Sequence, residues 1–363
     1  MELASLKVIG AVRTVRSLLR PIGWRGVAPT EGDLERCLLF PREQRVMSFD
    51  GTEIAYGVFG RQGPWVVLVP GFCCPDNFWR YLLPELARRH RVIVYDLRGL
   101  GLSGMPRAAG FRGRGVKADD FSIERHALDL EAVLDAERVR RTTLIGHSMG
   151  GQIILEAYRR MPKRIAGLVM LTAPFESPTR TLYGRNLDSV VKLTQLFIRA
   201  LPRPAVLAWR ALFLANPALT HRAAQLVRAL GPQAKAEDMV SYYRHMAFLD
   251  PLVLMKMADA MRLHSARDVL PTIAVPTLIV AGTRDTFTPP RLAKSMCDAI
   301  RGSEILFLEG ATHGSVIEFP DEVNQALLSF LRRRVERPRD RKGAGAGSRP
   351  GVSGARRTRA ALR

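Results

Sequence analysis

The feature that most constrains the fold is a series of short apolar runs that alternate with longer stretches of helical periodicity. The runs are rich in β-branched residues, as is typical of strands buried on both faces of a parallel sheet. They cover residues 65–70, 91–96, 142–146, 167–172, 276–282 and 304–310, and helical stretches at about 77–89, 120–137, 149–161, 290–301 and 320–333 lie between most of them. This order predicts an α/β fold with a mostly parallel sheet.

Two departures from the alternation indicate the domain organisation. Residues 45–59 have the pattern of an antiparallel hairpin that turns at Asp50 and Gly51, so the sheet is expected to open with a hairpin. The gap at 174–270 is too long for a connecting loop and is rich in helical stretches. It predicts a helical cap inserted between strands 6 and 7 of a core made of 44–173 and 271–333.

The two ends of the chain carry much of its formal net charge of +21. Residues 332–363 hold +10 and residues 1–20 hold +3. From 334 to 363 the chain is mainly Arg, Gly, Ala, Pro and Ser with almost no large apolar residue, so we expect a disordered basic tail. No recognised nucleic-acid module accompanies this charge, so nucleic acid is not expected to be the primary partner.

Residues 1–43 are expected to form a basic amphipathic helix followed by a linker. The helix is predicted by an apolar stripe flanked by arginines, namely Val8, Val12, Val15 and Leu19. Such a helix within residues 1–20 can make a peripheral contact with an anionic membrane. Packing onto the parent domain or onto a twin subunit remains an equal alternative, and the oligomeric state is left open.

Composition excludes several other classes of protein. The longest uncharged stretch, 269–283, has 15 residues and contains prolines, which is too short to span a bilayer. Four cysteines, with Cys73 and Cys74 adjacent, fit neither a disulfide framework nor a zinc spacing. We therefore expect a cytoplasmic protein, with membrane association open, and neither a metal nor a cofactor.

The sequence Gly146-His147-Ser148-Met149-Gly150 carries the strongest chemical signal. It follows an apolar strand directly and opens a helical stretch, the context of a G-x-S-x-G nucleophile turn. Glycines are needed where a sharp turn holds the serine in a strained conformation and brings strand and helix close together. Ser148 is therefore the candidate nucleophile.

A serine hydroxyl needs a base, which an acid must orient. His313 lies in a glycine-flanked loop just after the last strand, and Asp285 lies in the loop that follows strand 276–282. Both positions are at the carboxyl edge of a parallel sheet, where ligands gather in open α/β folds. His313 is the candidate base and Asp285 the candidate acid, with Glu176 as the rival acid.

Five segments in sequence order resemble the signature segments of the α/β-hydrolase superfamily, in its capped serine-hydrolase branch: LVPGFCCPDNFW, VIVYDLRGLGLSG, LIGHSMGG, PTLIVAGTRDTFTPP and EGATHGSVIEFP. The resemblance covers about residues 44–333 apart from the insertion. It implies that the backbone N–H groups of Phe72 and Met149 form the oxyanion hole. Pro70 stands where relatives usually carry histidine, but the donor is a backbone amide, so the hole is expected to survive.

The triad order Ser148, Asp285, His313 is the one typical of this family. We expect a serine hydrolase that cleaves an ester or related acyl bond in a small or medium, largely apolar substrate through an acyl-enzyme. Carbon–carbon bond hydrolysis, thioester hydrolysis and cofactor-free haloperoxidase activity remain alternatives on the same triad. A non-catalytic ligand-binding protein of this fold is the alternative of another class.

Other conspicuous residues receive simpler interpretations. His147 is expected to be a packing residue beside the turn. His245 is expected to lie on the surface of the cap, with a position facing the substrate as the alternative. Cys73 and Cys74 are expected to line the pocket. A Gly99-x-Gly101-x-x-Gly104 sequence spells a dinucleotide fingerprint, but no helix follows it, so NAD binding is not expected.

Overall fold

The computed structural model describes residues 30–106, 118–178, 189, 192–193, 196, 208–213 and 216–336. The predicted N-terminal helix at 1–20 and the tail from 337 onward lie outside these residues. Within them, the last helical segment, Leu331–Val335, extends two residues beyond the predicted end of the core at 333. No helix of the described part of the chain is long and apolar enough to cross a membrane.

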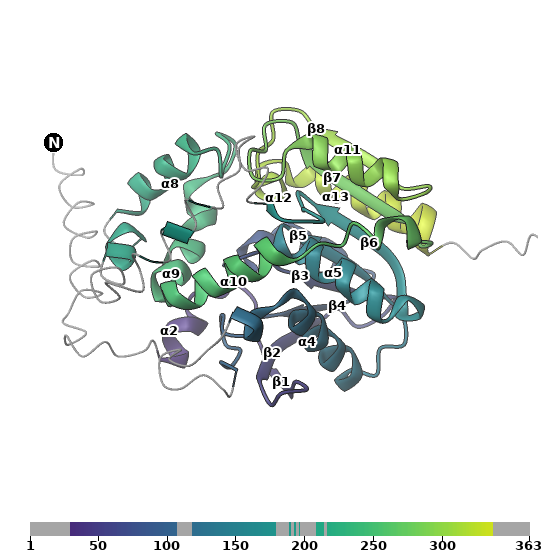
Figure 1. Ribbon diagram of the computed structural model, residues 1–363, viewed down its shortest axis with the longest axis horizontal. Helices are drawn as coiled ribbons and strands as arrows, with labels where there is room; N and C mark the ends of the chain where they lie inside the picture. The colour runs from purple at the N-terminus through teal and green to yellow at the C-terminus, as the bar shows by residue number, and fades with distance from the viewer. Residues whose placement is uncertain are drawn as a thin grey trace, which may run out of the picture.

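One eight-stranded sheet forms the centre of the described molecule (Figure 1). Its strands are β1 (Gln44–Met47), β2 (Glu53–Phe59), β3 (Trp65–Val69), β4 (Arg91–Tyr95), β5 (Thr142–His147), β6 (Ile165–Leu171), β7 (Thr277–Gly282) and β8 (Glu304–Leu308). Their order is β1-β2-β4-β3-β5-β6-β7-β8. Only β2 runs against its neighbours, pairing antiparallel with both β1 and β4, and the remaining pairs are parallel. The predicted hairpin and parallel sheet are confirmed.

The apolar runs become strands because both faces of the sheet are covered by helices. One face packs against α4 (Ile123–Ala136), α5 (Met149–Arg160) and α11 (Pro290–Ala299). The other face packs against α3 (Leu82–Ala87), α12 (Ser315–Glu318) and α13 (Pro320–Phe330). Every residue of β5 and β7 is buried, which explains why these strands read as continuous apolar runs rather than alternating ones.

The sharp turn of the hairpin depends on Gly51. Its φ of 78° lies in the left-handed region, where a residue without Cβ has no steric penalty. The turn also closes with a hydrogen bond from the Gly51 N–H to the Ser48 carbonyl at 2.9 Å. The Asp50-Gly51 pair therefore sets the start of the sheet, as the sequence predicts.

Short helical segments complete the core: α2 (Glu31–Glu35), η1 (Asp76–Trp79), η3 (Ala118–Phe121), η4 (Pro162–Arg164), η8 (Leu270–Thr272) and η9 (Leu331–Val335). Near η3, the guanidinium of Arg98 is fully buried and contacts Asp129 of α4 and Asp50 of the hairpin turn. A buried arginine of this kind requires such partners, because an unpaired charge inside a protein is costly. The contacts join the loop after β4 to the hairpin and to α4.

The described residues of the insertion between β6 and β7 form helices joined by turns and irregular segments, with no strand among them. It contains α8 (Pro217–Leu226), η7 (Ala236–Met239), α9 (Val240–Phe248) and α10 (Pro251–Leu263), which lie beside the sheet in Figure 1. Asp238 joins it to the core by accepting a hydrogen bond from the Tyr81 hydroxyl at 2.8 Å and pairing with Arg80 at 2.8 Å. This arrangement is compatible with the predicted cap.

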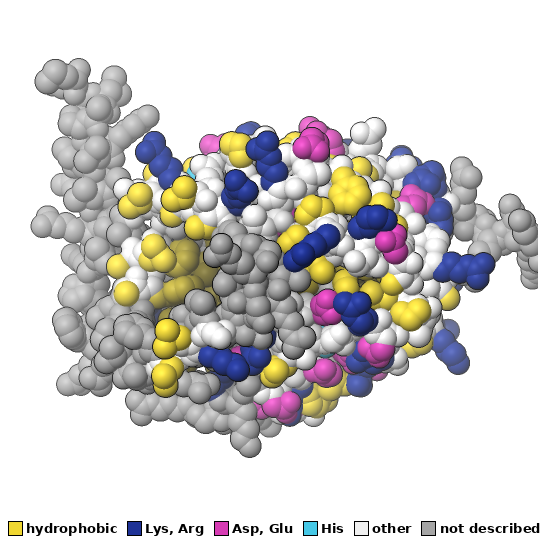
Figure 2. Space-filling view, turned by 45° about the horizontal axis from the view of Figure 1, so that its top comes forward, with side chains coloured by type: hydrophobic (Ala, Val, Ile, Leu, Met, Phe, Trp, Pro, Cys, Tyr) yellow, Lys and Arg dark blue, Asp and Glu magenta, His cyan; other side chains and the backbone are white. Residues whose placement is uncertain are grey.

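On the face drawn in Figure 2, Lys and Arg side chains are dispersed among acidic and apolar ones. They do not gather into a continuous basic stripe on that face. A groove that follows a nucleic-acid backbone requires clustered positive charge. This view of the described core offers no such groove.

Candidate active site

Ser148 lies in the tight turn between β5 and α5. Its backbone is strained, with φ 51° and ψ −122°, a region that non-glycine residues rarely occupy. The glycines of the motif permit a close approach, because a Cβ on Gly150 would lie 2.2 Å from the carbonyl oxygen of Val69 on the neighbouring strand. The turn therefore has the strand-turn-helix geometry that the motif predicts.

The structure brings Ser148, His313 and Asp285 together from three segments of the chain. Nε2 of His313 lies 2.9 Å from the Ser148 hydroxyl oxygen, and Nδ1 of His313 lies 3.0 Å from Oδ2 of Asp285. The histidine follows β8 and the aspartate follows β7, so both reach the carboxyl edge of the sheet at which β5 delivers the serine. The three side chains form a continuous hydrogen-bonded chain.

The surroundings of Asp285 favour its ionised form. Its carboxylate is buried, which opposes ionisation, but the His313 ring and hydrogen bonds from Thr288 outweigh burial and lower its pKa. Its Oδ1 accepts from the backbone N–H groups of Phe287 and Thr288 at 2.8 and 2.9 Å, and its Oδ2 accepts from the Thr288 hydroxyl. An ionised carboxylate only accepts, so Nδ1 of His313 donates and Nε2 of the neutral ring is left to accept from Ser148.

His147 supports the loop that carries His313. Its Nε2 lies 3.2 Å from the His313 carbonyl oxygen, which also accepts from the Thr172 hydroxyl at 3.2 Å. Burial, with a smaller contribution from repulsion by His313, lowers the pKa of His147 to about 3, so the ring is neutral and Nε2 is the donor. His147 packs against Phe78, as predicted, but this hydrogen bond to the base loop is an additional contact.

Glu318 links the same loop to the insertion, a contact that sequence reasoning missed. This buried carboxylate accepts from the N–H and hydroxyl of Thr312, the residue before His313. It also accepts from the N–H of Gly231, in the insertion, at 2.8 Å. Glu318 lies within the quoted EGATHGSVIEFP segment, but its partner Gly231 is 87 residues away, and spacing alone gives no indication of the contact.

The loop after β3 lies against the serine. A Cβ on Gly71 would lie 3.0 Å from Cβ of Ser148, which shows how closely the backbone of this loop approaches the side chain. Phe72 is the next residue of the loop, and Met149 is the first residue of α5. The N–H of a first helical residue has no acceptor within its own helix. Met149 therefore follows Ser148 in the chain, and Phe72 follows the glycine that lies against the Ser148 side chain.

Glu176, the rival acid, is paired elsewhere. Its carboxylate contacts the Arg267 guanidinium through two hydrogen bonds from Nη2, at 2.8 and 3.0 Å. The Nδ1 atom of His313 is already 3.0 Å from Asp285. The geometry favours Asp285 over Glu176 as the orienting acid.

The predicted surface position of His245 is wrong. The side chain is buried, and its Nε2 accepts from the N–H of Gly101 in the loop after β4, at 3.3 Å. Burial lowers its pKa to about 4, so the ring is neutral. His245 therefore lies in the interior, where it joins α9 to the core. The prediction failed because the 3.6-residue period of a helix does not show which of its faces another segment covers.

The glycine-rich loop is hydrogen-bonded within the protein, and burial affects the thiols of Cys73 and Cys74, whose predicted place in the lining of a pocket stays a prediction. Several N–H groups of the glycine-rich loop bond within the protein, including Gly99 to the Gly104 carbonyl at 2.9 Å and Gly104 to the Glu53 carbonyl at 2.7 Å. A dinucleotide fingerprint needs such groups free to bind phosphate. Burial raises the pKa of the Cys73 thiol well above its usual value and that of Cys74 to about 12, so neither forms a reactive thiolate near neutral pH.

Comparison with known proteins identifies the family. A sequence model described as the alpha/beta hydrolase fold matches residues 64–320, which is most of the chain. The chain belongs to the α/β-hydrolase family. The expected fold class and the expected class of enzyme, a hydrolase, are both confirmed.

Individual relatives agree with this assignment. A protein of Pseudomonas syringae pv. syringae named as a carbamate hydrolase, RutD, is 29% identical over 268 residues, covering 74% of this chain and 93% of the relative. A hydrolase from Pseudomonas aeruginosa PA01 has a similar structure, with a TM-score of 0.59, 26% identity, and coverage of 79% of this chain and 97% of the other. An esterase from Exiguobacterium antarcticum, at 23% identity, shares the fold with a TM-score of 0.62 over 80% of this chain and 99% of its own.

Proposed function

We propose that this α/β-hydrolase cleaves an ester or related acyl bond by a serine mechanism. The observation that carries the proposal is the hydrogen-bonded chain from the Ser148 hydroxyl through His313 to Asp285, with distances of 2.9 and 3.0 Å. A neutral imidazole that accepts from the serine and donates to an ionised carboxylate is prepared to act as a general base. No cofactor or metal takes part in the proposed steps.

The first half of the reaction acylates the enzyme. Ser148 Oγ attacks the carbonyl carbon of the substrate while His313 Nε2 takes the hydroxyl proton, and Asp285 stabilises the imidazolium that forms. The backbone N–H groups of Phe72 and Met149 donate to the oxyanion of the tetrahedral intermediate. The intermediate then collapses, the leaving group receives the proton from His313, and the acyl group remains on Ser148.

The second half releases the acid. His313 takes a proton from water, the resulting hydroxide attacks the acyl carbon, and a second tetrahedral intermediate forms at the same oxyanion hole. Collapse breaks the bond to Ser148 Oγ, which recovers its proton from His313. The products are a carboxylic acid and the leaving alcohol.

A small or medium, largely apolar acyl compound is the proposed substrate. Side chains near the site include Phe287, whose ring stacks on His313 with centroids 5.1 Å apart, and Phe78, which stacks on His147. A cavity of about 520 Å³ also lies near the base and acid loops, but its lining includes Gln225, Arg228, Arg284 and Thr312 and none of the triad residues. The proposed substrate class therefore rests on the aromatic side chains beside His313 and His147.

Carbamate hydrolysis is the second candidate, because the relative that is 29% identical is named for it. A carbamate presents the same carbonyl to the serine, but its leaving group or acyl part contains nitrogen. Thioester hydrolysis, carbon–carbon bond hydrolysis and haloperoxidase activity are further uses of the same triad. A non-catalytic ligand-binding role would require the triad to be idle.

The direct experiment measures hydrolysis of a panel of esters and carbamates of increasing acyl length by the wild type, Ser148→Ala and His313→Ala. We expect measurable turnover of at least one class by the wild type. Each variant should lose about 10⁴- to 10⁶-fold in kcat, because triad members act as a unit. Appreciable turnover by purified Ser148→Ala would reject the serine mechanism.

A further inference from the structure

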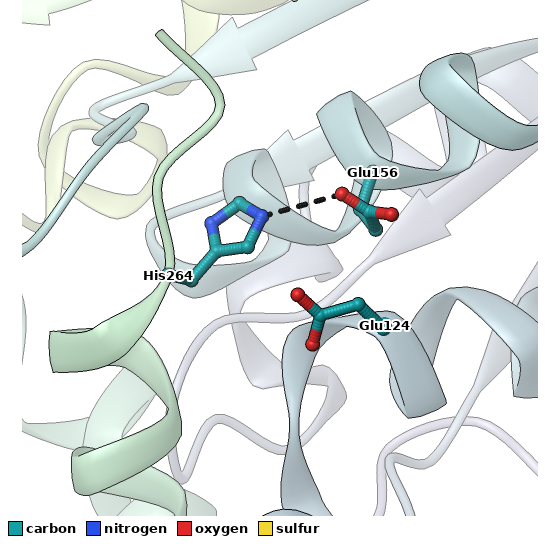
Figure 3. A group of neighbouring side chains, drawn as sticks. All are labelled: Glu124, Glu156 and His264. Atoms are coloured by element: carbon teal, nitrogen blue, oxygen red, sulfur yellow. Dashed lines mark ion pairs between the residues drawn. The ribbon is translucent and has the colours of Figure 1, made fainter. Parts of the chain in front are cut away.

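A second group of chemically active side chains lies outside the triad. Glu124 is in the first turn of α4, Glu156 is on α5, and His264 is the residue that ends α10 of the insertion. One potential ligand atom from each lies within 4.8 Å of the other two. In Figure 3 the three side chains, from three separate elements, point toward one another. We propose that these residues bind a divalent metal ion of the zinc type.

The His264 ring is buried, with 6% of its surface exposed, and its Nε2 atom has no hydrogen-bond partner in the described structure. That atom faces the carboxylate of Glu156 at 3.5 Å. Two ligands at 2.0–2.2 Å from a tetrahedral zinc ion are themselves roughly 3.4 Å apart. The observed separation therefore matches shared coordination and needs no large movement of either side chain.

The charges around the site favour a cation. Glu156 is 3% exposed, and a buried carboxylate requires compensation. Arg159 contacts Oε2 of Glu156 at 2.9 Å but also pairs with Asp268 at 2.7 Å. Arg159 is thus shared between two acids, and Glu124 adds a third carboxylate. A divalent cation would neutralise the excess negative charge of these carboxylates, and Arg159 would keep its contact with Asp268.

The second ring nitrogen of His264 lies beside Gln152. The Gln152 amide nitrogen is 3.4 Å from Nδ1 and 3.0 Å from the Met261 carbonyl oxygen. The buried amide oxygen of Gln152 has no partner in the described part of the chain. A metal on Nε2 leaves the ring proton on Nδ1, which then needs an acceptor. A flip of the Gln152 amide by about 180° would offer that oxygen to Nδ1 in exchange for the contact with the Met261 carbonyl, so the neighbouring shell contains an acceptor for a metal-binding histidine.

The donor set selects the class of ion. One imidazole with two carboxylates suits zinc and neighbouring first-row metals, whereas calcium and magnesium prefer oxygen ligands alone. Glu124 is exposed, which gives an ion a route from solvent. Because α5 begins immediately after Ser148, an ion held here would tie the end of α10 to the helix that carries the nucleophile. The proposal does not depend on the serine mechanism.

The test uses the full chain without a histidine tag, freed of metal by chelation and then titrated with zinc ions at pH 7.5 by calorimetry. We expect one zinc ion per chain, and a rise in the melting temperature on binding. Replacing zinc with cobalt should give visible absorption bands characteristic of a bound ion with nitrogen and oxygen ligands.

Glu124→Gln is the decisive variant. The Glu124 side chain is exposed, so removing its charge should not prevent folding. We expect it to weaken zinc binding by more than about 10-fold. Glu131→Gln, two turns further along α4, is the matched control and should bind like the wild type. His264→Gln should also abolish the cobalt bands. Failure of the wild type to bind zinc, or equal binding by Glu124→Gln and the wild type, would overturn the proposal.

Discussion

His147 shows how a single residue can have two roles in this molecule. Its ring packs against Phe78, and its Nε2 donates to the carbonyl of His313, whose own ring faces Ser148. The backbone of the proposed base is therefore held by the residue that precedes the proposed nucleophile. This arrangement fixes the position of the base without adding a charge, because His147 is neutral with a pKa lowered to about 3.

At the residue scale, the first prediction concerns the acid. Asp285→Asn should preserve packing but favour the wrong imidazole tautomer, and kcat for an ester substrate should fall by roughly 10⁴-fold, as in other triads. Glu176→Gln should change kcat far less, because Glu176 pairs with Arg267 rather than His313. The measurement is kcat of the two variants for the same ester, from steady-state kinetics. A greater loss in Glu176→Gln would mean that the acid is assigned to the wrong residue.

At the scale of elements, the site depends on three loops that meet at one edge of the sheet. Thr312 is held by Glu318, which also binds Gly231 of the insertion. Replacing a carboxylate oxygen with an amide nitrogen points a donor toward N–H groups that need an acceptor. A buried donor left unsatisfied costs about 1–3 kcal/mol. The position of the His313 loop should be sensitive to this change.

We therefore predict that Glu318→Gln lowers kcat by roughly 10- to 100-fold, the loss seen when a supporting shell is disturbed. The value of KM for a small ester should change less than kcat, because Glu318 acts through His313. Glu322→Gln on the exposed side of α13 is the control. Unchanged kcat in a folded Glu318→Gln protein would show that this contact does not position the base.

Most elements could be predicted from the sequence because their signals are local. Strands such as β5 are continuous apolar runs, Gly51 marks the hairpin turn, and the triad candidates each follow a strand. The contacts that sequence reasoning missed are different in kind. Glu318 with Gly231, and His245 with Gly101, join residues far apart in the chain. Nothing in the neighbourhood of either residue identifies such a partner, because the tertiary fold decides which segments meet.

The proposed metal site is a further case of this limit. The cysteines have no metal-binding spacing, so the sequence predicts no metal. Glu156 and His264 are 108 positions apart and lie on different elements. A ligand set assembled from a core helix and the end of the insertion has no local spacing to recognise, and becomes visible only once the fold brings the helices together.

At the scale of the whole molecule, three buried histidines should make stability depend on pH. Burial is the largest cause of the lowered pKa values, about 3 for His126 and His147 and about 4 for His245. In the unfolded chain each would titrate near 6.5, so below that pH the unfolded state binds protons that the folded state does not. The free energy of unfolding should therefore fall as pH drops below 6.5, by up to about 1.4 kcal/mol per histidine per pH unit.

Urea unfolding at pH 7.5, 6.0 and 5.0 measures this effect. His126→Leu is the informative variant, because neither ring nitrogen of His126 has a hydrogen-bond partner among the residues that the structure describes. In this variant, unfolding at acid pH should take up about one proton fewer than in the wild type, so the free energy of unfolding should depend less steeply on pH. A pH dependence equal to that of the wild type would show that His126 is not neutral in the folded protein.

The ends of the chain belong to the same scale. Residues 1–20 combine a charge of +3 with an apolar stripe, whereas the tail offers charge alone. Deleting residues 1–20 should reduce binding to anionic lipid vesicles even at high salt, because apolar insertion is not screened. Deleting 334–363 should matter only at low salt. Equal binding by the full chain and the 1–20 deletion in a sedimentation assay would reject the membrane contact.

The central claim is that Ser148 is an activated nucleophile. Its most direct test is reaction of the folded wild type with a fluorophosphonate probe, followed by mass spectrometry of the peptides. We predict one label per chain on Ser148, none in Ser148→Ala, and strongly slowed labelling in His313→Ala, because the serine then lacks its base. Absence of labelling in the folded wild type, or labelling of another residue in its place, would contradict the account.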